Sequence, residues 1–118
     1  MYGVDSSLDL SMFHGGTCIQ VAIGQFCCQL AFHPDARLTI EGSWSLLGPD
    51  RLEIDRSCGL EERDCFRLHR VLGMVVAQAI AEPPSSIVIE FEDGTCLRVF
   101  DDRSNFESFT IEPGGIVV

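Results

Sequence analysis

Hydrophobic and polar residues alternate through two stretches of this chain, as they do in β-strands with one buried face. In the first stretch Ile19, Val21 and Ile23 form one alternating set, and Gly24-Gln25 after them fits a two-residue type II′ turn. This turn predicts a hairpin that pairs Ile23 with Phe26, Val21 with Cys28 and Ile19 with Leu30.

The first stretch continues into a third and a fourth expected strand. The reversal at 33–37 pairs Phe32 with Leu38 and keeps the apolar side chains on the same face. It also pairs Leu30 with Ile40. Trp44 and Leu46 then continue the alternation, so we expect a fourth strand beside this meander.

The second stretch follows the same plan with a tighter turn. Glu92-Asp93-Gly94 reads as a three-residue loop with Gly in the left-handed position of a G1 bulge. That loop pairs Phe91 with Thr95, Ile89 with Leu97 and Ile87 with Val99. A preceding strand over 73–80, a loop over 81–86 and a closing strand over 106–111 complete the predicted unit.

These two stretches form a weak internal repeat, roughly 16–46 and 73–111, within a single domain spanning 1–118. One helix is expected near residues 60–72, between the two copies, with Gly73 as its C-cap. An apolar face on each copy must be buried. The predicted fold is therefore mainly β (α+β), with two similar antiparallel units of three to four strands packed as a sandwich or partly open barrel.

Composition supports a globular chain, since 46% of the 118 residues are hydrophobic. No apolar run approaches the roughly 20 residues that a membrane helix needs, and the N-terminus does not read as an export signal. Without export, the six cysteines are expected to be reduced thiols in a cytoplasmic protein.

The charge of the chain limits its partners. A net charge of −10 argues against nucleic acid and anionic membranes, which attract clustered Lys and Arg. The same charge suits either simple solubility or docking to a basic protein. Meanders also leave edge strands that can pair with a second copy, so self-association into a homodimer or a larger oligomer is expected.

Metal and nucleophile chemistry have weak sequence signals. Cys65 and His69 are four residues apart on the predicted helix, with Cys58 upstream, but they make only half a zinc site. Cys65, His69 and Asp64 contain the groups of a nucleophilic triad, although neighbours on one short helix rarely reach that geometry. We therefore predict no catalytic residue, metal or cofactor.

The repeat itself marks a candidate ligand site. Glu41 and Glu107 each precede a serine and an aromatic residue in their own copy, so the two acids could meet across the duplication. The candidate ligand-binding residues are Glu41, Trp44, Phe106, Glu107 and Phe109. Such a pair of acids could anchor a ligand, serve as acid and base in an enzyme, or have only a structural role.

A second candidate site is acidic and lies at the second hairpin. We expect carboxylates on the turn and after its partner strand to lie near one another, as a solvated acidic rim, an interaction surface or a Ca²⁺ site without the EF-hand spacing. The residues of this surface are Glu90, Glu92, Asp93, Asp101 and Asp102.

The segment from Phe91 to Ile111 resembles a group of small uncharacterised bacterial proteins. They carry an L-x-F-x-D-G-x-x-L hairpin followed by an aromatic-Glu-Ser-aromatic-x-Ile strand. Here Ile89 replaces the first Leu, and Phe106 stands where Tyr is common. The resemblance implies a small mainly-β domain and brings no activity or cofactor.

Three functional hypotheses follow from these patterns. The first is a non-enzymatic, acidic binding protein, in its most concrete form an immunity-type antagonist of a basic partner such as a nuclease toxin. The second is a small-ligand binder with a pocket between the two β units or at a subunit interface. The third is an enzyme that uses paired carboxylates.

Overall fold

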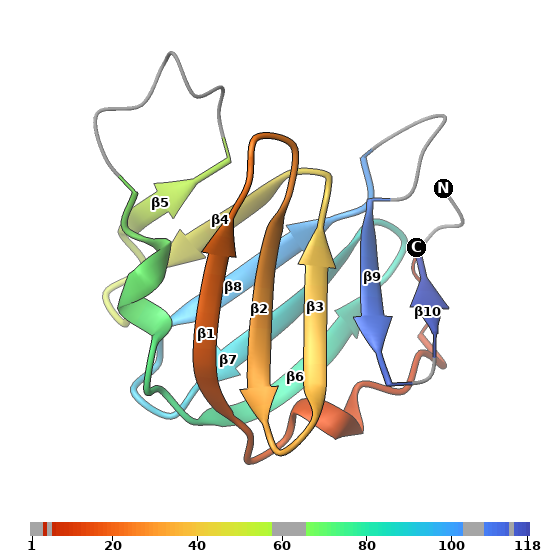
Figure 1. Ribbon diagram of the computed structural model, residues 1–118, viewed down its shortest axis with the longest axis horizontal. Coiled ribbons are helices and arrows are strands. Elements are labelled where there is room, and N and C mark those ends of the chain that lie inside the picture. The colour runs from red at the N-terminus through yellow and green to blue at the C-terminus, as the bar shows by residue number, and fades with distance from the viewer. Residues whose placement is uncertain (1–3, 5, 58–65, 103–107, 114) are drawn as a thin grey trace.

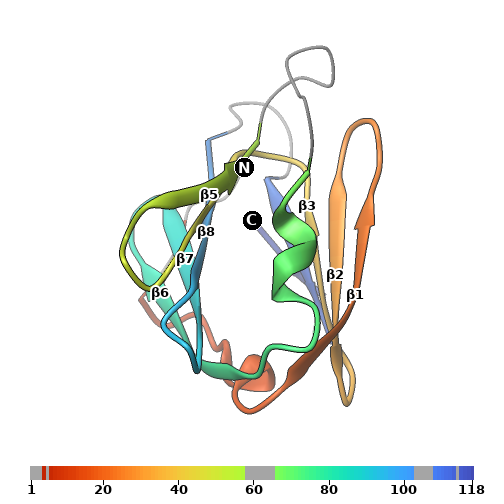
Figure 2. The same ribbon diagram turned by 90° about the vertical axis from the view of Figure 1, so that its left-hand side faces the viewer.

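The computed structural model describes residues 4, 6–57, 66–102, 108–113 and 115–118, and these form two antiparallel five-stranded sheets packed face to face (Figures 1 and 2). The first sheet has the order β1 (Thr17–Ile23), β2 (Cys28–His33), β3 (Ala36–Ile40), β9 (Phe109–Glu112) and β10 (Ile116–Val117). The second has the order β6 (Val76–Glu82), β7 (Ser86–Phe91), β8 (Cys96–Phe100), β4 (Trp44–Leu47) and β5 (Glu53–Arg56). The predicted sandwich of mainly β structure is confirmed, and it is not a closed barrel.

Each three-stranded meander sends its next strand to the opposite sheet. Strand β4 follows β3 but pairs with β8, and β9 follows β8 but pairs with β3. The strands expected at Trp44–Leu46 and at the end of 106–111 therefore exist, yet each extends the other meander rather than its own. This exchange ties the two halves of the chain into one sandwich.

The two halves match in detail around a central contact. Short 3₁₀ helices, η1 (Ser11–Phe13) and η3 (Leu68–Val71), precede β1 and β6, and both of these strands have an irregularity near their start. At the centre, Thr17 bridges Val75 in antiparallel fashion. Gly15 N–H donates to Val76 O (2.9 Å), and Gly73 N–H donates to Cys18 O (2.8 Å), so the hydrogen bonds are paired in the same way on each side.

The core lies between the sheets and contains apolar residues of both. Leu30 and Leu38 of one sheet and Ile89 and Leu97 of the other are fully buried, as expected from their alternation. Phe32 packs edge to face on Phe13, with ring centroids 5.3 Å apart. Burying such side chains stabilises the fold by about 1.5–3 kcal/mol each.

The first hairpin has a different register from the predicted one. Its connection is four residues, 24–27, so Val21 pairs with Leu30 rather than with Cys28. Leu30 likewise pairs with Leu38 instead of Ile40. A shift of two residues keeps the paired side chains on their faces, but the irregularity between Cys18 and Gln20 changes that for Ile19, which is exposed while Cys18 is buried. Phe26, which was expected to pair with Ile23, lies in the turn and is exposed.

The second hairpin agrees with its predicted register. Phe91 N–H donates to Thr95 O (2.8 Å), Gly94 has φ of 94°, and Ile89 pairs with Leu97. The loop expected over 81–86 is shorter, since β6 runs to Glu82 and β7 begins at Ser86.

The helix expected near 60–72 falls partly on 58–65, which lie outside the described residues. The described remainder contains only the four-residue helix η3. Across the residues that the structure describes, no helix is long and apolar enough to cross a membrane.

Candidate functional site

A cleft of about 370 Å³ lies at the end of the sandwich where the β1–β2 turn meets the crossover from β3 to β4. Ligand pockets in proteins span roughly 300–1,000 Å³, so this cleft has room for a small molecule. Its described lining comes from the turn, the crossover and three single positions, namely Ile23, Gly24, Gln25, Phe26, Cys27, Cys28, Ile40, Glu41, Gly42, Ser43, Trp44, Ser57, Phe66 and Asp102.

Two carboxylates, Glu41 and Asp102, line this cleft from different halves of the chain. Ser43 N–H donates to Oδ1 of Asp102 (3.3 Å), which holds that side chain against the crossover. Gly42 leaves the space for it, because a Cβ there would lie 2.9 Å from the same oxygen. The residue beside the acid is therefore glycine for a steric reason.

Backbone hydrogen bonds fix the crossover that carries Glu41. The N–H groups of Glu41 and Gly42 both donate to Ser108 O, at 2.8 Å each. From the other half, Phe100 N–H donates to Ser43 O (2.9 Å). The first two bonds join the end of β3 to the start of β9, and the third joins the end of β8 to the start of β4. The backbone next to Glu41 and Asp102 is therefore held by both sheets.

Aromatic rings form the apolar part of the lining. Trp44 is buried at the start of β4. Its backbone N–H donates to Ser57 Oγ (3.1 Å), and its backbone carbonyl accepts from Ser57 N–H (3.0 Å). Phe26 is exposed at the tip of the β1–β2 hairpin, and Phe66 is half-buried. A ligand in the cleft would therefore meet aromatic side chains of two separate segments, Phe26 and Phe66, while Trp44 borders the cleft from the core.

Asp55 positions the chain just after Phe66. Its buried carboxylate accepts hydrogen bonds from three backbone N–H groups, those of Arg56 (2.8 Å), Arg67 (2.8 Å) and Leu68 (2.9 Å). These bonds attach the start of η3 to the edge strand β5. Phe66 thus approaches the cleft from a segment fixed by a buried acid.

The electrostatic character of the cleft is one-sided. Among the described residues that line it, two are acidic and none is basic. Carboxylates attract a bound cation through Coulomb interaction, and aromatic rings in the same lining can add cation–π contact. The lining therefore suits a positively charged group attached to an apolar one.

In the second half of the chain, the position equivalent to the cleft is filled by the segments that contain Val4 and Val118. Val118 takes the place of Ser57, since Val118 N–H donates to Phe109 O (2.9 Å) as Ser57 N–H does to Trp44 O. Val4 N–H donates to Pro84 O (2.9 Å) in the turn that corresponds to the tip of the first hairpin. Both valines are buried in the core, so the duplication leaves a cleft where these terminal segments do not reach.

The structure brings some predicted ligand residues together and separates others. Glu41 and Trp44 both line the cleft. Phe109 is fully buried in β9 and belongs to the core. Phe106 and Glu107 lie outside the described residues, so the expected pairing of Glu41 with Glu107 stays a prediction.

The five predicted acidic-surface residues do not share one location. Glu92 and Asp93 lie at the β7–β8 turn, whereas Asp101 and Asp102 follow β8 at its other end. Asp101 is buried and accepts a hydrogen bond from Ser108 Oγ (2.9 Å).

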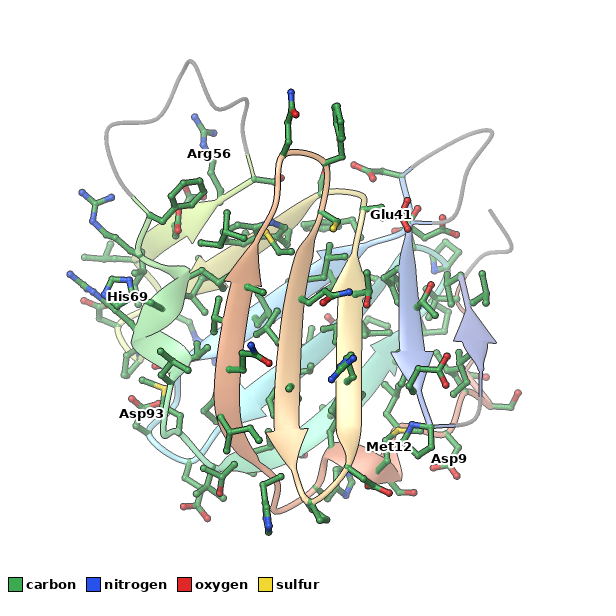
Figure 3. The ribbon with its side chains drawn as sticks, in the orientation of Figure 1. Asp9, Met12, Glu41, Arg56, His69 and Asp93 are labelled. Atoms are coloured by element: carbon green, nitrogen blue, oxygen red, sulfur yellow. The ribbon has the colours of Figure 1, made fainter. Side chains whose placement is uncertain are left out.

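The fifth residue, Glu90, is half-buried on β7 near the Cys96 thiol. Figure 3 shows Asp93 and Glu41 at well-separated parts of the molecule.

Among the described thiols, Cys27 and Cys28 line the cleft, whereas Cys18 and Cys96 do not. Cys18, Cys27 and Cys96 are free thiols, and burial raises the pKa of Cys18 to about 11. Cys58, Asp64 and Cys65 of the hypothetical zinc site and nucleophilic triad fall outside the described residues, and His69 is exposed. Over the described ranges, no group of three or more His, Cys, Asp or Glu side chains is placed to hold a metal ion.

Sequence reasoning did not assign Phe26, Phe66 or Asp102 to the ligand site. Phe26 was expected to face Ile23 inside the sheet, and Asp102 was assigned to the acidic surface. Only the duplication gave a usable signal, because it marked the segment containing Glu41 and Trp44 as a repeated corner.

No protein-family model matches this sequence, and no curated protein or solved structure is similar enough to count as a match. The function of the cleft therefore has to be inferred from its own geometry.

Proposed function

We propose that this protein binds a small organic cation with an apolar group, such as an aryl-alkyl amine, in the cleft between its two sheets. The observation that carries the proposal is the lining itself: Glu41 and Asp102 with Trp44, Phe26 and Phe66, and no basic side chain among its described residues. This is the small-ligand hypothesis, with the class of ligand made specific.

The expected interactions have different magnitudes. A charge-assisted hydrogen bond to a carboxylate contributes about 1.5–3 kcal/mol, and a cation–π contact about 0.5–2 kcal/mol depending on burial. Burying an aryl group adds to the affinity without discriminating charge. The carboxylates should therefore decide which ligands bind, and the rings should decide how tightly.

Fluorescence of Trp44 provides the test, because it is the single tryptophan of the chain and lines the cleft. We expect phenethylamine to change its emission saturably. Phenethyl alcohol, which has the same shape without the charge, should bind about tenfold more weakly, equivalent to about 1.4 kcal/mol. Phenylacetate should not bind. Equal affinity for all three, or no saturable change with any of them, contradicts the proposal.

Two variants distinguish binding in the cleft from attraction of the amine by the net negative charge of the chain. Asp102→Asn should lower the affinity for phenethylamine about tenfold, because the amide keeps the shape and loses the charge. Glu92→Gln removes one charge at the distant β7–β8 turn and should leave the affinity unchanged. If both variants weaken binding equally, the amine is attracted by net charge and not by the cleft.

The acidic-antagonist hypothesis has the net charge of −10 in its support and stays a prediction. Asp9, Glu41 and Asp93 lie well apart from one another in the view of Figure 3. We also expect a cytoplasmic location, since Cys18, Cys27 and Cys96 are free thiols and suit a reducing compartment.

A further inference from the structure

The β1–β2 hairpin is uncharged in a strongly acidic protein. No Asp, Glu, Lys, Arg or His occurs from Gly15 to Phe32, while the whole chain has a net charge of −10. The hairpin also exposes apolar side chains: Ile19 is 59% exposed, Ile23 38% and Phe26 82%. An exposed, uncharged hairpin at the margin of a sheet is unusual, because natural edge strands are normally protected by charge or cover.

The other three sheet edges are protected. Strand β5 presents the exposed ion pair of Glu53 and Arg56 (Oε1 to Nε, 3.7 Å), and β10 is only two residues long. Strand β6 ends in the exposed Glu82, and His14 Nε2 lies 3.4 Å from Ala79 O on that strand. Each of these edges has a charge, a side-chain cap or too little length to pair.

Among the described residues, strand β1 has no equivalent of the side-chain cap on its counterpart β6. Counting from the irregularity in each strand, Val21 corresponds to Ala79, and the residue that corresponds to His14 is Leu72. Leu72 is apolar and 47% exposed, so its side chain cannot hydrogen-bond to a backbone carbonyl.

At the outer edge of β1, Cys18 N–H donates to Met74 O (2.9 Å) and Cys18 O accepts from Gly73 N–H (2.8 Å), and among the described residues no backbone bond reaches this edge of the strand beyond Cys18. Within the described part of the chain, β2 is the only strand paired with the remainder of β1.

We propose that β1 of one molecule pairs antiparallel with β1 of a second copy, joining two five-stranded sheets into one continuous sheet across a twofold axis. The charge distribution indicates that the strand pairing with β1 belongs to a second copy. Two chains of −10 repel wherever acids face acids, and this uncharged edge is where they can approach without that repulsion. A suitable partner strand has an uncharged edge with apolar side chains, and β1 of a second copy has both properties.

The proposal does not depend on the ligand. Ile23 and Phe26 of the hairpin also line the cleft, but Ile19 and Gln20 do not. Edge substitutions at these last two positions can therefore change association without altering the lining. Failure of dimerisation and failure of amine binding would be separate results.

Sedimentation velocity over about a hundredfold range of concentration tests the inference on the full chain. The wild-type protein should shift from monomer to dimer. Ile19→Lys places a charge on the edge and should weaken the dimer at least about tenfold. Ile80→Lys is the matched control, since Ile80 is an exposed isoleucine on the protected strand β6, and it should leave the dimer unchanged.

Thermal unfolding of both variants establishes that each is folded before its association is compared. A wild-type protein that stays monomeric at every concentration overturns the proposal. So does a dimer that Ile80→Lys disrupts as strongly as Ile19→Lys. A dimer sensitive only to the β1 substitution supports it.

Discussion

The carboxylate of Asp102 occupies the space that a side chain at residue 42 would need. An added Cβ on Gly42 would lie 2.9 Å from Oδ1 of Asp102 and 3.2 Å from the carbonyl oxygen of Phe100. One of these neighbours is backbone and cannot move away easily. The absence of a side chain at Gly42 thus allows an acid from the second half of the chain to reach the cleft in the first.

Gly42→Ala should therefore disturb both the fold and the site. Overpacking of this kind typically costs about 1–3 kcal/mol of stability. We expect chemical denaturation to show a loss in that range, and Trp44 fluorescence titrations to show weaker phenethylamine binding because Asp102 is displaced. A Gly42→Ala protein with wild-type stability and affinity would show that the crossover can relax around the methyl group.

Asp55 offers a second test, of how Phe66 is positioned. Asp55→Ala leaves three backbone N–H groups without their carboxylate, and we expect a loss of stability of about 2–4 kcal/mol together with weaker ligand binding. Asp50→Ala is the control, since exposed Asp50 accepts only the local N–H of Leu52 (3.0 Å) among its described bonds. Equal losses in the two variants would contradict the role given to Asp55.

The thiol of Cys18 predicts a dependence of stability on alkaline pH. Burial raises its pKa in the folded state from 9.0 to about 11, so the unfolded chain ionises first as the pH rises. The contribution is complete below about pH 9 and declines as the pH rises towards 11.

Denaturant unfolding at about pH 8 and about pH 10 checks this prediction. Cys18→Ala should lose less stability between these two conditions than the wild-type protein does. The substitution also removes a buried side chain, which lowers stability by a similar amount at both pH values and cancels in the comparison. Identical pH dependence in the two proteins would rule out Cys18 as the source.

Much of the sheet structure could be predicted because alternation and turn residues act locally. Gly94 sets the loop of the second hairpin, and the pairing of Ile89 with Leu97 follows from it. In the first hairpin the connection is two residues longer than Gly24-Gln25 suggests, and the register moves while the faces stay correct. Ile19 and Phe26 are the exceptions, because neither the strand irregularity nor the longer turn is visible in the alternation.

The exchange of strands between sheets could not be predicted from the pattern. Trp44 and Phe109 read as continuations of their own meanders, since alternation records which residues share a face and not which sheet they join. The cleft depends on that exchange, because it brings Asp102 beside Gly42. Long-range contacts of this kind leave no periodic signal, so only Glu41 and Trp44 were found in advance.

The proposed organic cation binds between Glu41, Asp102 and the aromatic rings. Two-dimensional NMR of the ¹⁵N-labelled protein during titration with phenethylamine tests it most directly. We predict saturable shifts that are largest for the amides of Glu41, Gly42 and Ser43 and for the Trp44 indole, and that weaken in Asp102→Asn. Shifts centred elsewhere, or the same shifts in Asp102→Asn, would contradict the account.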